Sequence, residues 1–71
     1  MVTEIKIDVN SPKGNVFYLL GLGKKLLKDM ASKDLIPKMI DEVYKAEDYN
    51  KAVDVINSYI GRVGFRIVLN D

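Results

Sequence analysis

The residues best suited to bind a ligand form the short turn Ser11-Pro12-Lys13-Gly14-Asn15, directly ahead of an apolar segment with helical spacing. The first N–H groups of a helix and the positive end of its dipole attract anions, and Lys13 adds a positive charge. Ser11, Lys13, Gly14 and Asn15 are therefore a candidate anion-binding turn for a phosphate or a carboxylate. The same residue types also suit a plain strand-to-helix turn, in which Gly14 permits positive φ and Asn15 caps the helix. The plain turn is the commoner of the two.

A stripe of three lysines, Lys24, Lys25 and Lys28, follows on the polar side of the helical segment. It could meet an acidic partner or a phosphate-rich ligand, although a solvated helix face is the more common reason for such a stripe. The stretch Gly21-Leu22-Gly23-Lys24-Lys25, which includes two of these lysines, imitates the end of a P-loop. Because the GxxxxGK[ST] spacing is missing, nucleotide hydrolysis is not expected.

Four of the six aromatic residues are tyrosines, and all four fall in segments with helical spacing. Tyrosine is enriched at interfaces because it combines a large contact area with a polar tip. Tyr18 and Tyr44 lie at the margins of their apolar stripes, which makes them candidates for partner contact, although residues in such positions more commonly edge the core.

Missing residue types exclude several chemistries. The chain has no His, Cys or Trp, so zinc fingers, thiolate nucleophiles and Ser-His-Asp triads are ruled out. Asp41 with Glu42, and Glu47 with Asp48, are neighbours in sequence and do not face each other on a helix. The spacing of an EF-hand is absent as well. We therefore expect no catalytic residues, no metal and no cofactor.

The charges are nearly balanced, with 11 basic and 10 acidic residues and a net charge of +1. Residues 1–38 carry +3 and residues 39–71 carry −2. Nucleic-acid binding normally requires strong, clustered positive charge, so a nucleic acid is not an expected partner. No run of 18 apolar residues and no signal-peptide pattern occurs, which predicts no membrane association and a cytoplasmic location.

Five segments must position these residues. Residues 2–9 and 62–69 alternate apolar with polar side chains, which predicts two strands. Between them, apolar residues recur every three or four positions and predict helices over residues 16–30, from residue 35 to residue 44, and over 49–60. Residues 1–71 are then a single small β-α-α-α-β domain of the α+β class, with the terminal strands paired and covered by helices.

Helix boundaries follow from the residues that cap or break a helix. We expect Asp34 to cap the second helix, because Pro37 then falls in the first turn, and Asp48 to cap the third. Gly61 is the expected stop of the third helix. Gly21 and Gly23 each cost the first helix about 1 kcal/mol relative to alanine, so they mark either a close helix crossing or a weak helix.

A two-stranded sheet has two open edges and is marginally stable alone. A second copy would cover one edge, either through a continuous four-stranded sheet or through packed helices. We therefore expect a homodimer or a higher homo-oligomer. The alternative is a monomer whose edges are guarded by Lys6 and Arg66.

The stretch Asn10–Phe17, which reads NSPKGNVF, and the later Glu47-Asp48-Tyr49-Asn50 resemble a group of short proteins encoded by bacteriophages and bacterial mobile elements. In that group an S-P-x-G-N-x-F signature follows a short strand, and a (D/E)-Y-x-x-(L/A) stretch opens a later helix. The resemblance implies a protein that acts by binding, including as an inhibitor of host defence systems. Lys13 stands where the group often has an acidic residue, so no functional residue is carried over.

Two functions follow as hypotheses. The first is a non-enzymatic, phage-encoded binding protein that acts as a homo-oligomeric inhibitor or adaptor of a host defence protein in the host cytoplasm. The alternative is a sponge that sequesters an anionic or nucleotide small molecule at the anion-binding turn and the lysine stripe. A catalytic role is the least supported, since no pair of nucleophile and base can be assembled without His or Cys.

Overall fold

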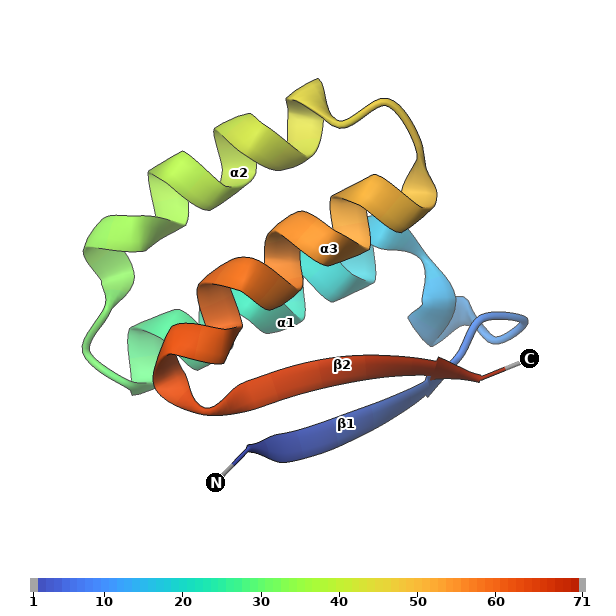
Figure 1. The fold of residues 1–71 in the computed structure, drawn as a ribbon, viewed down its shortest axis with the longest axis horizontal. Helices are drawn as coiled ribbons and strands as arrows, with labels where there is room; N and C mark the ends of the chain where they lie inside the picture. The colour runs from blue at the N-terminus through green and yellow to red at the C-terminus, as the bar shows by residue number, and fades with distance from the viewer. Residues whose placement is uncertain (1, 71) are drawn as a thin grey trace.

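The first and last strands of the chain lie side by side (Figure 1). The structure is a computed structural model that describes residues 2–70. Strands β1 (Thr3–Asp8) and β2 (Phe65–Asn70) form a two-stranded parallel sheet, with Ile5 beside Ile67. Parallel neighbours need a crossover connection, which the helical part of the chain supplies. The predicted β-α-α-α-β domain with paired terminal strands is confirmed, and the structure adds the parallel direction that the sequence pattern left open.

Three helices lie between the strands: α1 (Val16–Asp29), α2 (Ile36–Lys45) and α3 (Tyr49–Ile60). The predicted caps of α1 and α3 are confirmed. The side chain of Asn15 accepts a hydrogen bond from the Phe17 N–H at 2.7 Å, and that of Asp48 accepts one from the Lys51 N–H at 2.8 Å. Each bond satisfies an N–H group that has no partner inside its helix.

The predicted cap of α2 is wrong. Asp34 lies inside a short 3-10 turn, Lys33–Leu35, that leads directly into α2. The Leu35 N–H donates to the Ser32 carbonyl at 3.0 Å, so the backbone of this turn takes the place of a side-chain cap. Pro37 still falls in the first helical turn as expected, where its missing N–H leaves no bond unmade.

The end of α3 differs from the prediction in its geometry. The helix ends before Gly61 as expected, but Gly61 keeps a helical φ of −59° and starts a second 3-10 turn. Gly64 ends that turn with φ of 91°, a conformation that favours glycine. The extra turn and Gly64 together take the first three residues of the predicted strand 62–69, so β2 begins only at Phe65.

Helix α3 is the centre of the fold because it packs against α1, α2 and β2 (Figure 1). The largest fully buried side chains are Leu19, Leu27, Met39, Ile56 and Ile60. Two isoleucines from the inner face of the sheet, Ile7 and Ile67, complete this core. Met30, the last residue of the predicted helix 16–30, is 49% exposed, because α1 ends one residue before it.

The two glycines of α1 have different surroundings. A Cβ atom added to Gly23 would lie 3.2 Å from Met39 and Ile56, so Gly23 marks a close crossing of the three helices. A Cβ atom on Gly21 would meet nothing within 4 Å. Only one of the two glycines therefore has a packing reason within the chain.

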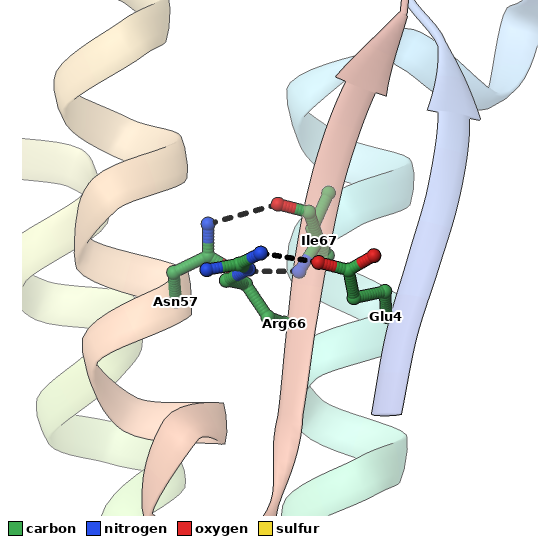
Figure 2. Close-up of polar contacts among 4 residues, drawn as sticks. All are labelled: Glu4, Asn57, Arg66 and Ile67. Carbon is green, nitrogen blue, oxygen red and sulfur yellow. Dashed lines mark hydrogen bonds and ion pairs between the residues drawn. The ribbon is translucent and has the colours of Figure 1, made fainter. Parts of the chain in front are cut away.

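An asparagine side chain closes the middle of the outer edge of β2. Asn57 of α3 donates to the Ile67 carbonyl at 3.1 Å and accepts from the Ile67 N–H at 2.7 Å, as Figure 2 shows. Its amide thus imitates the hydrogen bonds of a neighbouring strand and ties α3 to β2. Arg66 of β2 forms an ion pair with Glu4 of the neighbouring strand β1 (Figure 2).

Two tyrosine hydroxyls tie helices to other parts of the chain. Tyr49 donates to the Gly14 carbonyl and so links α3 to the turn after β1. Tyr59 donates to the carboxylate of Glu42 and so links α3 to α2. This hydrogen bond raises the pKa of Tyr59 above its usual value of 10.0, because it stabilises the protonated phenol beside a negative charge.

Alanine substitutions should separate the two glycines of α1. We expect Gly21→Ala to raise the free energy of unfolding by about 1 kcal/mol, because alanine favours the helix and the added methyl group meets no atom. Gly23→Ala has the same gain in helix propensity but crowds Met39 and Ile56, which costs about 1 to 3 kcal/mol. We therefore expect no gain, or a loss of up to about 2 kcal/mol. Urea unfolding of both variants measures this difference, and equal stabilisation by both would contradict the crossing at Gly23.

Alkaline pH should weaken the fold through Tyr59. Because its pKa is raised in the folded state, folding holds this proton more tightly than the unfolded chain does. The contribution is complete below the unfolded pKa and is lost as the pH rises through the folded one. We expect wild type to lose more stability than Tyr59→Phe between about pH 9 and pH 11. Urea unfolding across this range measures both slopes, and identical slopes would refute the role of this hydrogen bond.

Candidate functional site

The predicted anion-binding turn has most of its N–H groups already occupied. The N–H groups of Ser11, Gly14 and Asn15 donate to carbonyls three residues earlier, at 3.1, 2.9 and 3.2 Å. The side chain of Asn15 accepts from Phe17 at the start of α1. Lys13 is exposed, and its amino group has no ion pair among the described residues. An anion at this turn would have to displace existing hydrogen bonds, so the geometry favours the plain strand-to-helix turn.

A glycine is required at position 14 because a side chain would clash there, and not because of its backbone angles. A Cβ atom at this position would lie 2.6 to 2.8 Å from the backbone of Val9. Gly14 permits positive φ but does not adopt it, and Gly64 is the glycine with positive φ in the described part of the chain. The close approach to Val9 lets the chain fold back from β1 toward α1.

The lysine stripe lies apart from that turn. Lys24, Lys25 and Lys28 are all exposed and lie in the second half of α1. Lys25 follows Asn15 by ten residues, which corresponds to about 15 Å along a helix. A small anion held at the turn is therefore out of reach of the stripe, and the structure does not bring the two candidate sites together.

Three exposed aromatic side chains gather where α1 begins and α2 ends. Phe17, Tyr18 and Tyr44, which we call the aromatic surface, are 66%, 43% and 67% exposed. Tyr18 and Tyr44 were the candidate contact residues, with the core edge as the alternative. Their exposure leaves both side chains accessible to a partner, whereas the other two tyrosines are held by hydrogen bonds inside the fold.

An apolar hollow of about 280 Å³ lies between the start of α1, the end of α2 and the start of α3. The buried side chains of Leu20, Val43 and Ala52 contribute its floor. Phe17 and Tyr44, both exposed, border it. The hollow is therefore open to solvent and offers mainly carbon atoms to a ligand.

A second hollow, more open than the first, lies on the outer side of α1. It is lined by Phe17, Tyr18, Gly21, Leu22 and Lys25 and has a volume of about 350 Å³. Phe17 belongs to both hollows and so separates them. No neighbouring atom requires a glycine at position 21. Because Gly21 has no side chain, the second hollow is deeper at this point.

Sequence reasoning did not single out Phe17 or Gly21 as site residues. A signal for Phe17 was present, because among the buried positions Leu19, Leu20, Gly23 and Leu27 it has three- or four-residue spacing to Leu20 alone and so lies at the margin of the buried stripe. A bulky apolar residue off the buried stripe of a helix must face solvent or a partner. For Gly21, helical spacing alone does not separate a glycine at a helix crossing from one at the surface.

The carboxylates that were weighed for catalysis have structural partners. Asp41 and Glu47 form ion pairs with lysines one turn later, Glu42 accepts from Tyr59, and Asp48 caps α3. Between Val2 and Asn70, the structure holds no group of three or more acidic side chains that could bind a metal ion. None of the helices in this part of the chain is both long enough and apolar enough to cross a membrane.

Comparison with known proteins adds no relative. No protein-family model matches the chain, and neither does a curated protein or a solved structure. The resemblance of Asn10–Phe17 to phage-encoded proteins therefore stays a prediction, and the aromatic surface with its two hollows is the candidate site on geometry alone.

Removing the aromatic surface should leave the fold intact. We expect Phe17→Ser and Tyr44→Ser each to change the free energy of unfolding by less than about 0.5 kcal/mol, because both side chains are mostly exposed. Leu20→Ala is the matched control from the floor of the same hollow, and it should cost about 2 to 5 kcal/mol. Urea unfolding measures all three variants. A large loss in Phe17→Ser would mean that this side chain belongs to the core.

Proposed function

We propose that this chain is a non-enzymatic binding protein that docks a segment of another protein on its aromatic surface. The observation that carries the proposal is the position of Phe17, an exposed aromatic side chain between two hollows with apolar linings. Single exposed apolar residues are common on protein surfaces, but neighbouring ones around a hollow are typical of interaction sites. Aromatic side chains also supply a large share of binding energy at interfaces.

Gly21 supports the same surface. It lowers the stability of α1 and has open space where a side chain would be. A small residue at that point lets the backbone of a partner approach α1 closely, beside Tyr18 and Leu22. Nothing inside the fold requires that space, so a partner is the physical reason we assign to it.

Charge indicates the chemistry of the partner segment. Lys25 lines the second hollow, and Lys24 and Lys28 are exposed on the same helix. A segment with bulky apolar side chains for the hollows and acidic side chains for these lysines would complement both features. We therefore propose an acidic amphipathic segment as the occupant.

The resemblance of Asn10–Phe17 adds a biological setting to this proposal. It suggests a phage-encoded inhibitor or adaptor that binds a host defence protein in the cytoplasm. That part of the proposal rests on the resemblance alone. Sequestration of an anionic small molecule, the alternative function, draws no support from the geometry of the turn and the lysine stripe.

Selection from a displayed library of random peptides of about 16 residues, four helical turns, tests the docking surface. The bait is the wild-type chain, and peptides that also bind Phe17→Ser/Tyr44→Ser are removed. We expect enriched peptides to combine aromatic or aliphatic residues with Asp and Glu. Lys25→Glu should weaken their binding about fivefold, because it reverses a charge beside the second hollow.

Met30→Ser is the matched control, since Met30 is an exposed apolar residue of comparable accessibility outside the aromatic surface. It should leave the affinity of the selected peptides unchanged in a fluorescence-anisotropy titration. The proposal fails if no peptide stays enriched once binders of Phe17→Ser/Tyr44→Ser are removed, or if Met30→Ser weakens the binding of the selected peptides as much as Lys25→Glu does.

A further inference from the structure

The two edges of the sheet are treated differently by the fold. Asn57 occupies the N–H and C=O of Ile67 in the middle of the outer edge of β2. Helix α3 therefore blocks this edge (Figure 2). In Figure 1, β1 lies on the outside of the molecule, with no helix along its free edge. A free strand edge is a template for pairing with another strand.

Hydrogen-bond direction identifies the free groups of β1. The N–H groups of Thr3 and Val9 donate to the carbonyls of Gly64 and Asn70, so the backbone groups of the odd-numbered residues of β1 face β2. Because bonding direction alternates along a strand, the backbone groups of Glu4 and Lys6 face outward. Both residues are exposed, and the hydrogen bonds among the described residues include none to these outward groups.

We propose that the free edge of β1 pairs with β1 of a second copy in antiparallel direction, giving a four-stranded sheet in the order β2-β1-β1-β2. A twofold axis requires the antiparallel direction, because each strand must meet the same strand of the other copy. This proposal does not depend on the aromatic surface, whose lining residues all lie outside the strands.

The charges select one register for this pairing. We name each register by the residue that lies opposite itself in the second copy, at the twofold axis. Residues whose backbone groups face outward must lie opposite each other, which leaves registers centred on Glu4, Ile5, Lys6 or Ile7. Centring on Glu4 or on Lys6 places like charges opposite each other, which destabilises a strand pair. Centring on Ile7 requires the backbone of Asp8, whose carbonyl already accepts the N–H and the hydroxyl of Ser11 at 3.1 and 2.7 Å.

The register centred on Ile5 satisfies these conditions. Glu4 then lies opposite Lys6 of the second copy, and each such pair exchanges two backbone hydrogen bonds. Within one copy, Glu4 already pairs with Arg66, and Lys6 lies beside Val68 without an ion pair to any carboxylate of residues 2–70. The dimer therefore places each Glu4 between two cations and gives each Lys6 an acidic neighbour.

Sedimentation equilibrium tests the dimer against the 8.0 kDa mass of one chain. A strand-to-strand interface is small, so we expect a dissociation constant in the micromolar range and a dimer at about 100 µM protein. Lys6→Glu places acidic side chains opposite each other twice and should raise the dissociation constant at least about tenfold. Lys38→Glu makes the same charge change at an exposed lysine of α2 and should leave the dissociation constant unchanged.

A charge-swapped partner makes the test specific for the register. Glu4→Lys/Arg66→Glu keeps an ion pair within the chain but places lysines opposite each other, so this variant should also be monomeric. Mixed with Lys6→Glu, it restores opposite charges at both positions, and we expect a heterodimer of wild-type affinity. Circular dichroism confirms that both variants are folded.

Three results would overturn the proposal. Wild type could stay monomeric at about 100 µM, above the expected micromolar dissociation constant. A dimer could survive Lys6→Glu and dissociate in Phe17→Ser, which would place the interface on the aromatic surface. The two folded charge variants could also fail to associate on mixing, which would exclude this register. Peptide binding by the aromatic surface is measured separately, so failure of either proposal leaves the other standing.

Discussion

The fold depends on joining the two ends of the chain in one parallel sheet. Thr3 lies beside Phe65, so this contact closes a loop of about sixty residues and carries a large entropy cost. The cost is offset because the inner faces of both strands, with Ile7 and Ile67, pack into the helical core. The helices in turn need the sheet, since α3 would otherwise expose the side of its surface that packs on β2. Neither layer is complete without the other.

A few polar side chains give this packing its specific geometry. The amide of Asn57 ties α3 to β2, Tyr59 ties α3 to α2, and Tyr49 ties α3 to the turn after β1. All three residues belong to α3, and each bond reaches a different neighbour. Apolar contacts alone tolerate small rotations of a helix, whereas these hydrogen bonds are directional. Helix α3 is therefore the part of the molecule against which the other elements are oriented.

Local sequence patterns predicted the three α-helices and both strands, because alternating and helical spacings are set by which side chains must be buried. They did not predict features that depend on distant atoms. Asn57 is polar in a helix, and its partner is the backbone of Ile67, which carries no side-chain signal. Gly14 is required because the backbone of Val9 leaves no room for a side chain. Asp34 does not cap α2, because a backbone turn leads directly into that helix. The exposed position of Phe17 follows from spacing, but the hollows on either side of it require three helices to be placed.

The two candidate surfaces use separate parts of the molecule, so occupation of one leaves the other accessible.

Parallel pairing of the end strands has a mechanical consequence as well. The start of β1 and the end of β2 lie at opposite ends of the sheet (Figure 1). Tension applied through the chain would pull the strands along their length, in shear. The hydrogen bonds of the ladder would then share the load and break together instead of opening one at a time. Resistance to pulling is governed by the unfolding barrier and not by equilibrium stability. Parallel pairing of the end strands therefore loads this small domain in the shear direction, in which the ladder bonds act together.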